Sequence, residues 1–454
     1  MWASVPSSVI CLFGDTLRKI LNVKKPTVEI HGFVKPGFES VKDAFRQNFD
    51  NYLEPEGATL AIYHKGELVA NLWAGDANSK VNKKWAQDTL CIAFSTTKIA
   101  TAMCLALLVD RGLVQYEDLV TKYWPEFGKN GKSSVTVRML VSHQAGVAIL
   151  DQDVTFDTVR DYEKMSTLLE DQTPNWTISE QKAGYHAITF GFLIDQLVRR
   201  VDPQKRSLGR FFREEIAIPY GRTHFSGKLQ IVHAARVVTQ RQNQTLDKGK
   251  TIVWLELLSD IEFYIGLPDE HHDRVCHLIG PNALQFVYDL SEPDFIRAIY
   301  RMCKNPTSTL LWQSLKNPKW LEVGKNGETA FNDPELYKLE IGGANGICTA
   351  KALAKLLTLF IGEKPIFSPN LMQILEKPLL TDSPDVVLGV NMNYGHGLMY
   401  FKNPNGHYKI GHTGYGGQNA RLDPDYQMSI AYLHNALSSD SGAYSRTFKI
   451  LENA

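Results

Sequence analysis

The chain has 454 residues, which is long enough for a large hydrophobic core and for two lobes. Lysine plus arginine and aspartate plus glutamate both number 49, and this zero formal net charge argues against nucleic acid or an anionic membrane as the main partner. Hydrophobic residues make up 44% of the chain, and no apolar stretch is long enough to cross a bilayer, so we expect a globular protein without a membrane span.

Residues 1–35 are expected to form an N-terminal tail. They lack a basic segment ahead of the short apolar run, so they make a poor signal peptide. Residues 16–25 could form a basic amphipathic turn or two, which leaves an organelle address as an alternative to a cytoplasmic location. Six cysteines without paired spacing favour free thiols in a reducing compartment, and we therefore expect a cytoplasmic protein. These cysteines are Cys11, Cys91, Cys104, Cys276, Cys303 and Cys348.

Two elements are predicted before the first chemical motif. Apolar residues at helical spacing predict an amphipathic helix over residues 36–52. Two β-rich runs flank Lys65-Gly66 and predict a hairpin over residues 58–75. A hairpin that is followed by a helix is the start of a sheet covered by helices.

The stretch that organises the chain contains Ser95 and Lys98 in a Ser-x-x-Lys pattern. The alanines and leucines that follow predict a buried helix ending near Gly112. The i, i+3 spacing puts both side chains on one helix face, close enough to exchange a proton, and a lysine in a dry pocket has a lowered pKa. Such a lysine can activate a serine alcohol as a nucleophile. Taken alone, the pattern more often marks a helix-capping serine and a solvated lysine, but the apolar context favours the nucleophile.

The β-rich ends and the helical middle of the chain predict an α/β fold. We expect an antiparallel sheet flanked by helices, built from both chain ends (about 36–115 and 340–454), with an inserted and mainly helical lobe (about 116–339). The run at 428–435 alternates so little that burial on both faces is expected. The other segments behind this prediction are helical runs at 188–200 and 281–303, strand-like runs at 394–401 and 407–414, and a final helix from residue 438.

Two more motifs lie downstream, Tyr185-His186-Ala187 and His412-Thr413-Gly414. Together with Ser-x-x-Lys, their order and spacing resemble the serine β-lactamase superfamily, most closely its class C β-lactamase and esterase branch. Residues 137–146 and 345–350 add supporting matches. The resemblance runs from about Gly37 to the C-terminus and implies one β-lactamase-related domain over residues 36–454 with a β-lactamase/transpeptidase-like fold.

The resemblance implies a serine hydrolase in which Ser95 attacks a carbonyl and forms an acyl-enzyme. Lys98 and Tyr185 would share the general-base role, with the first proton acceptor left open and Tyr185 expected to activate water for deacylation. Backbone N–H groups of Ser95 and Tyr415 would form the oxyanion hole. No metal or cofactor is expected, and the partner would be a small acyl substrate. The substrate-binding residues implied are His412, Thr413 and Gly414.

Two departures from the β-lactamase pattern favour an ester or a small amide as the substrate. Ala187 stands where β-lactamases carry the asparagine of Tyr-x-Asn, so an amide hydrogen bond to the substrate is absent. His412 replaces the commoner lysine, so a fixed positive charge is absent unless the histidine is protonated. A catalytically weak or inactive scaffold that binds partners is the alternative, since fold does not fix function.

Residues 222–260 do not fit their surroundings. Over residues 222–250, six lysines and arginines stand against one acidic residue in an otherwise neutral chain. Relatives pass almost directly from the sequence before this stretch to the sequence after it. We therefore expect an insertion, which is either a lineage-specific loop or translated intron sequence.

Overall fold

The computed structural model describes residues 28–438 except for 52, 222–260, 281–309, 311–312, 315–316, 322–328 and 363–364. The predicted insertion at 222–260 and the predicted helix at 281–303 lie outside the described residues, as do Cys11 and Cys303. Of the predicted final helix, only its first residue, Ser438, is described. Within these ranges, none of the helices combines the length and the apolar character that crossing a bilayer requires.

The elements have the following bounds. The helices are α2 (Glu39–Asp50), α3 (Thr97–Asp110), α4 (Val137–Val141), α5 (Phe156–Arg160), α6 (Tyr162–Asp171), α7 (Thr189–Val201), α8 (Leu208–Phe212), α9 (Ile218–Tyr220), α15 (Pro334–Tyr337), α16 (Ala350–Thr358) and α17 (Pro369–Leu375). The strands are β1 (Ile30–Val34), β2 (Gly57–His64), β3 (Glu67–Asn78), β4 (Lys83–Lys84), β5 (Cys91–Ile92), β6 (Phe263–Tyr264), β7 (Ile347–Cys348), β8 (Leu380–Pro384), β9 (Asn391–Gly395), β10 (Leu398–Lys402), β11 (Tyr408–Thr413), β12 (Asn419–Asp423) and β13 (Met428–His434).

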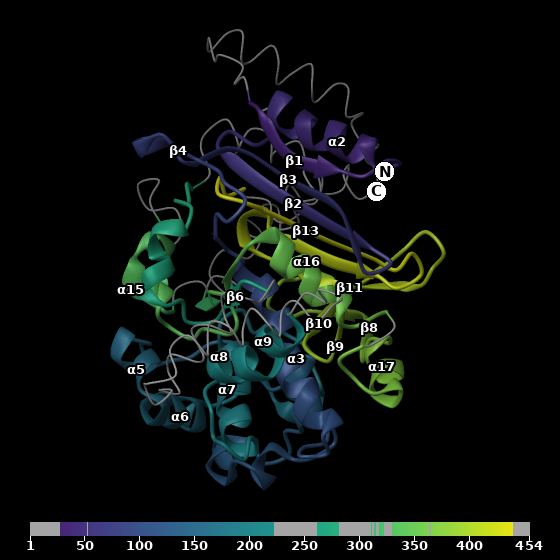
Figure 1. The fold of residues 1–454 in the computed structure, drawn as a ribbon. Helices are drawn as coiled ribbons and strands as arrows, with labels where there is room; N and C mark the ends of the chain where they lie inside the picture. Colours follow the sequence, from purple (N-terminus) through teal and green to yellow (C-terminus); the bar gives the residue numbers. More distant parts are fainter. Residues whose placement is uncertain are drawn as a thin grey trace, which may run out of the picture.

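The main sheet joins the two parts of the chain that are furthest apart in sequence. Its strand order is β1-β3-β2-β13-β12-β11-β10-β9-β8, with β4 added beside β3. β13 pairs antiparallel with both β2 and β12, so the purple and yellow strands lie side by side in Figure 1. The expected antiparallel sheet from both chain ends is confirmed, and β13 is buried along nearly its whole length as predicted.

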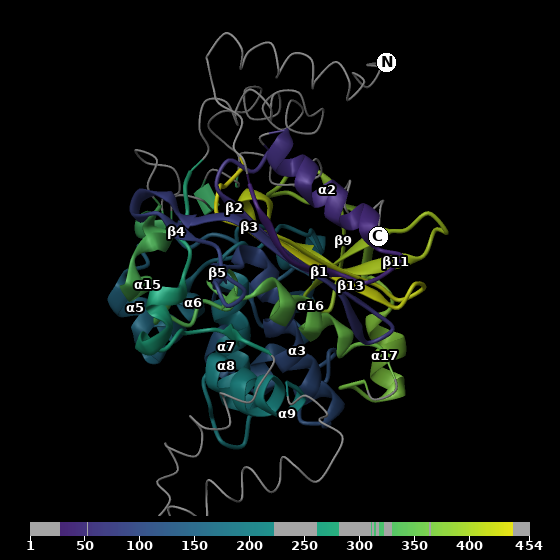
Figure 2. The same ribbon diagram turned by 45° about the horizontal axis from the view of Figure 1, so that its top comes forward.

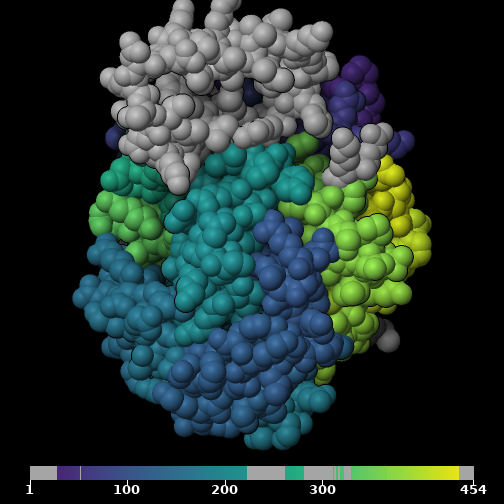
Figure 3. All heavy atoms as spheres, turned by 60° about the horizontal axis from the view of Figure 1, so that its bottom comes forward, coloured from purple at the N-terminus to yellow at the C-terminus, as the bar shows by residue number. Residues whose placement is uncertain are grey.

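Helices cover both faces of this sheet. On one face α2 packs Phe45 against Tyr432 of β13, with ring centroids 6.1 Å apart. α16 lies on the opposite face, with α3 beyond it, as Figure 2 shows. The middle of the chain forms the helical side of the molecule, where its blue and teal residues border the green residues that follow (Figure 3). The lobe boundaries near residues 115 and 339 stay a prediction.

Two local expectations are wrong. Residues 30–34 were expected in the N-terminal tail but form β1, the edge strand beside β3. This strand is short, and its Gly32 has φ 97° where a Cβ atom would lie 1.9 Å from Asn71 O, so only its pairing with β3 reveals it. Residues 394–401 are the two arms of a hairpin, because His396 and Gly397 both have positive φ (56° and 79°) and reverse the chain.

Candidate active site

Ser95 lies in a short 3₁₀ turn (Phe94–Thr96) between β5 and α3. The Ala93 N–H donates to Gly346 O at 2.7 Å. This bond connects the segment before Ser95 to the residue that precedes β7. The first turn of a helix has N–H groups without acceptors in the helix and carries its positive dipole end. Ser95 is half-buried. It lies just before the start of α3, where the free N–H groups of the first helical turn can interact with an anion.

The residue before the serine has an uncommon backbone conformation. Phe94 has φ 45°, in the left-handed region that disfavours residues other than glycine. Its ring centroid lies 4.8 Å from that of Phe331 and 5.6 Å from that of Tyr415. Strain of this kind is typical of positions whose geometry serves a function.

Lys98 is fully buried and points its amine at Ser95. Lys98 Nζ lies 2.6 Å from Ala187 O, 2.8 Å from Gly343 O and 3.3 Å from Ser95 Oγ. A neutral amine has two N–H groups and one lone pair, and carbonyl oxygens only accept. The two carbonyls therefore take the two N–H groups, and the lone pair is left to accept the Ser95 hydroxyl proton.

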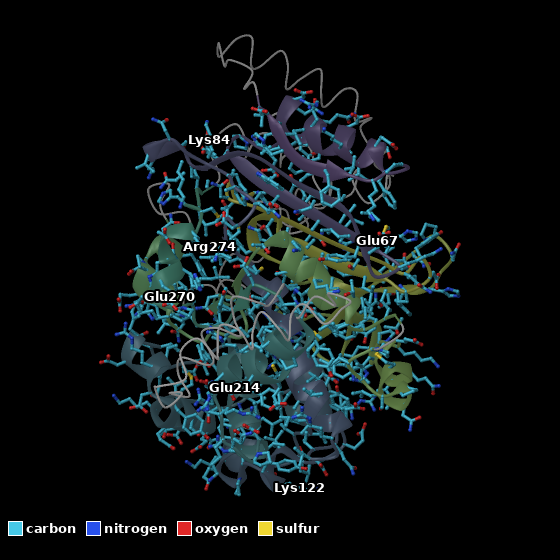
Figure 4. All side chains as sticks on the ribbon, viewed as in Figure 1. Glu67, Lys84, Lys122, Glu214, Glu270 and Arg274 are labelled. Carbon is cyan, nitrogen blue, oxygen red and sulfur yellow. The ribbon has the colours of Figure 1, made fainter. Side chains whose placement is uncertain are left out.

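Burial supports the neutral amine. It lowers the pKa of Lys98 well below 10.5, and no carboxylate among the described residues opposes the effect. Lys132 is also fully buried, and burial lowers its pKa to about 8. The carboxylates of Asp171 and Glu170 act in the opposite direction and raise this pKa. Ordinary lysines such as Lys84 and Lys122 lie at the periphery (Figure 4).

Tyr185 is the third member of this group. Its hydroxyl is hydrogen-bonded to the Ser95 side chain, and its ring centroid lies 4.8 Å from Lys98 Nζ. Burial raises the pKa of Tyr185, so the resting form is the neutral phenol. Because Ser95 gives its proton toward Lys98, it accepts from Tyr185, and the three side chains form one donor chain.

His412 is the second-last residue of β11 and lies beside Tyr185, with their ring centroids 6.0 Å apart. Its Nδ1 lies 2.5 Å from Thr413 O, so Nδ1 carries the proton and Nε2 keeps its lone pair. Burial lowers the pKa of His412 to about 3, so this position carries no charge at neutral pH. Across the described ranges, no three His, Cys, Asp or Glu side chains are grouped so that they could hold a metal ion.

The end of β11 lies directly against the serine segment. A Cβ atom on Gly414 would lie 2.7 Å from Ala93 O, so only glycine permits this approach. Thr413 Oγ1 donates to Met399 Sδ at 3.8 Å. Tyr415 follows in a 3₁₀ turn (Tyr415–Gly417), next to the Phe94 ring. The two amides predicted for the oxyanion hole thus come from neighbouring segments.

The backbone groups that hold Lys98 were not among the residues predicted from the sequence. Ala187 was noted for its side chain, yet its carbonyl is what contacts the lysine, and Gly343 was not identified at all. One signal was present, because the Tyr-His-Ala-x-Thr-x-Gly run ends in Gly191. A Cβ atom on Gly191 would lie 2.1 Å from Gly343 N, so this glycine lets α7 approach the Gly343 segment.

Buried neutral histidines predict acid-sensitive stability. Burial lowers the pKa of His186 to about 4 and that of His412 to about 3, both below the ordinary 6.5. The unfolded chain therefore binds protons first as the pH falls, and stability is lost from pH 6.5 downward. Each histidine contributes roughly 3 kcal/mol to the loss at pH 4. Urea unfolding at pH 7, 6, 5 and 4 measures this, and a free energy of unfolding independent of pH would contradict it.

Comparisons with known proteins identify the family of the chain. The model of the Beta-lactamase family matches residues 45–454. Esterase/beta-lactamase LipL of Mycobacterium tuberculosis is 29% identical over 418 residues, covering 90% of this chain and 84% of that protein. A crystal structure of a family VIII carboxylesterase is 27% identical with a TM-score of 0.72, covering 94% of this chain and 99% of that one. A penicillin-binding protein homologue from Caulobacter crescentus is 28% identical with a TM-score of 0.69, covering 94% and 98%.

The superfamily resemblance that the three motifs carried is thus confirmed over most of the chain. The fold is the β-lactamase/transpeptidase-like one, as expected. On the family match and on the two full-length structural neighbours, the chain belongs to the Beta-lactamase family.

Proposed function

We propose that this serine hydrolase cleaves an ester or a small amide through an acyl-enzyme on Ser95. The observation that carries the proposal is the chain of contacts from Tyr185 to Ser95 to Lys98. It joins a nucleophile to a buried amine whose lone pair faces it and to a neutral phenol. The printed names of LipL and of the family VIII carboxylesterase support an esterase of this type.

In acylation, Ser95 Oγ attacks the carbonyl carbon while its proton passes to Lys98 Nζ. The N–H groups of Ser95 and Tyr415 stabilise the oxyanion that forms. Tyr185 then gives its phenolic proton to the departing alkoxide or amine, and the bond to the leaving group breaks. The acyl-enzyme holds the Lys98 ammonium beside the Tyr185 phenolate, a favourable pairing at the 4.8 Å separation of the amine and the ring.

In deacylation, water takes the place of the leaving group. It gives a proton to the Tyr185 phenolate and attacks the acyl carbon. When the second tetrahedral intermediate collapses, Ser95 Oγ leaves and receives the proton of the Lys98 ammonium. Both groups are neutral again, so the cycle closes with no metal or cofactor. This order makes Lys98 the first base and keeps Tyr185 as the base for water.

The substrate class follows from two side chains. Ala187 offers no amide to the acyl group, and neutral His412 offers no charge to a substrate carboxylate. β-Lactam antibiotics carry both an amide and a carboxylate, whereas a simple ester needs neither partner. We therefore assign a small acyl substrate without a carboxylate as the partner. Four free buried cysteines support a reducing, cytoplasmic location: Cys91, Cys104, Cys276 and Cys348.

The test compares p-nitrophenyl butyrate with a chromogenic cephalosporin and maps the residue that a fluorophosphonate labels. We expect the label on the peptide that contains Ser95. The cephalosporin lacks an amide partner at Ala187 and a charged partner at His412, and each missing contact is worth roughly 1–3 kcal/mol. We therefore expect its kcat/KM to be lower than that of p-nitrophenyl butyrate by about 10²-fold or more. Equal turnover of both substrates would refute the substrate assignment. Folded protein that neither turns over nor takes the label would establish the inactive scaffold instead.

A further inference from the structure

The loop that carries Tyr185 is held by the N–H groups of three successive residues. Gly184 N donates to His143 O at 2.9 Å, and His186 N donates to His143 Nδ1 at 3.2 Å. Between them, Tyr185 N donates to the Asp385 carboxylate. The N–H groups of the residues before and after Tyr185 therefore both donate to one residue, His143.

His143 also contacts the Tyr185 ring, and Tyr394 packs against both rings. The His143 ring centroid lies 5.0 Å from that of Tyr185 and 4.7 Å from that of Tyr394. Tyr394 stacks on Tyr185 at 6.4 Å with an angle of 11° between the rings. The Tyr394 hydroxyl donates to Asp385 Oδ2 at 2.8 Å, so the carboxylate that holds the Tyr185 amide also fixes the stacking partner.

His186 ties this loop back to the segment that follows His143. Its Nε2 accepts from Val147 N at 3.0 Å, and its Nδ1 donates to Gly184 O at 2.7 Å. The rings of His143 and His186 each accept a hydrogen bond from a backbone N–H group, so both must be neutral. Burial is the main cause that lowers the pKa of His143 well below 6.5, and repulsion from His186, Lys98 and His412 would lower it further whenever these groups are protonated.

The backbone of His143 argues that its ring is needed. His143 has φ 61°, in the left-handed region that is unfavourable for residues other than glycine. Glycine would avoid this cost and would still supply the carbonyl for Gly184. It would not supply the Nδ1 acceptor for His186 or the ring surface for Tyr185.

We propose that His143 is a positioning residue for Tyr185: it holds the phenol against Ser95 so that the phenol can protonate the leaving group. The inference rests on the proposed function. His143 takes no proton itself. It acts by accepting the N–H groups of Gly184 and His186 and by the contact of its ring with that of Tyr185. Loss of this positioning will matter most where the leaving group cannot depart without a proton.

The test uses two leaving groups and two amide side chains. p-Nitrophenolate departs from p-nitrophenyl butyrate as an anion, whereas ethanol must be protonated as it departs from ethyl butyrate. In His143→Asn, Oδ1 stands near the place of Nδ1, and asparagine tolerates left-handed backbone. In His143→Gln, the acceptor moves away and the His186 N–H is left without it. We compare kcat/KM, which reports acylation, for both esters.

We expect His143→Gln to lower kcat/KM by about 10²-fold for ethyl butyrate and by no more than about 10-fold for p-nitrophenyl butyrate. His143→Asn is expected to stay within about threefold of the wild type for both esters. His396 provides the matched control, since it is also buried and left-handed (φ 56°), and its ring packs on Tyr116. His396→Gln is expected to change both esters by the same factor.

An equal loss for the two esters in His143→Gln, or a loss in His143→Asn as large as that in His143→Gln, would overturn the positioning role. Wild-type protein without ester turnover that depends on Ser95 would overturn the proposed function itself. The two failures are therefore separated by the wild-type measurement in the same assay.

Discussion

Replacing Ser95 with alanine is expected to lower kcat/KM for p-nitrophenyl butyrate by at least about 10³-fold and to abolish fluorophosphonate labelling. The change removes the oxygen that would form the acyl bond. It leaves Lys98 bonded to Ala187 O and Gly343 O, so the buried amine keeps two of its three contacts. The free energy of unfolding is expected to change by only about 1 kcal/mol.

Ser134→Ala is the matched control for that experiment. Ser134 is exposed, and it lies outside the residues placed at the site. This variant is expected to keep wild-type turnover and wild-type labelling. Labelling that persists in Ser95→Ala would place the nucleophile elsewhere and would refute the mechanism.

Lys98→Met is expected to lower kcat/KM for the same ester by roughly 10²–10⁴-fold, the usual contribution of general acid–base catalysis. Methionine fills similar volume but offers no lone pair to the Ser95 hydroxyl. In the wild type, Lys98 must be neutral to act, so kcat/KM rises with pH and levels off above the Lys98 pKa. The rise of kcat/KM with pH is expected well below pH 10.5, because burial lowers the pKa of Lys98. This rise is expected to be absent in Lys98→Met.

Lys132→Met separates the catalytic effect from the loss of a buried amine. Lys132 Nζ also donates to two carbonyl oxygens, Glu170 O at 2.9 Å and Gln172 O at 2.5 Å, and its amine lies 5.4 Å from the Phe127 ring centroid. It resembles Lys98 in burial and in donating to two carbonyl oxygens, but it lies outside the residues placed at the site. Lys132→Met is expected to lower stability while kcat/KM still rises with pH. A wild-type pH profile in Lys98→Met would contradict the assignment of Lys98 as the first base.

The side chains of the site could be predicted because their chemistry is visible in residue type and spacing. Ser95, Lys98 and Tyr185 carry reactive groups, and the structure brings all three into contact. Their supports could not be predicted in the same way. The carbonyl of Gly343 is a backbone group that every residue has, so nothing in the sequence marks it as the partner of a buried lysine.

The strands of the main sheet also differ in how far they could be predicted from the sequence. β13 is apolar and was predicted, whereas β12 reads Asn-Ala-Arg-Leu-Asp and was not. All five residues of β12 are nonetheless buried, because their polar groups find partners. Arg421 donates to Asn419 Oδ1 at 3.1 Å and stacks 4.0 Å from the Phe401 ring centroid. Rules based on alternating apolar residues cannot detect a strand that is stabilised by such contacts.

The position of β13 has a consequence for synthesis of the chain on the ribosome. β13 is the last described strand in chain order, yet every residue from Met428 to His434 pairs with β2. β2 leaves the ribosome early, and this edge stays unpaired until residues 428–434 have been made. An apolar strand edge that waits so long is open to pairing with other nascent chains, which makes a chaperone that shields it valuable. The same delay means that hydrolase activity is expected only after residues 428–434 have been translated.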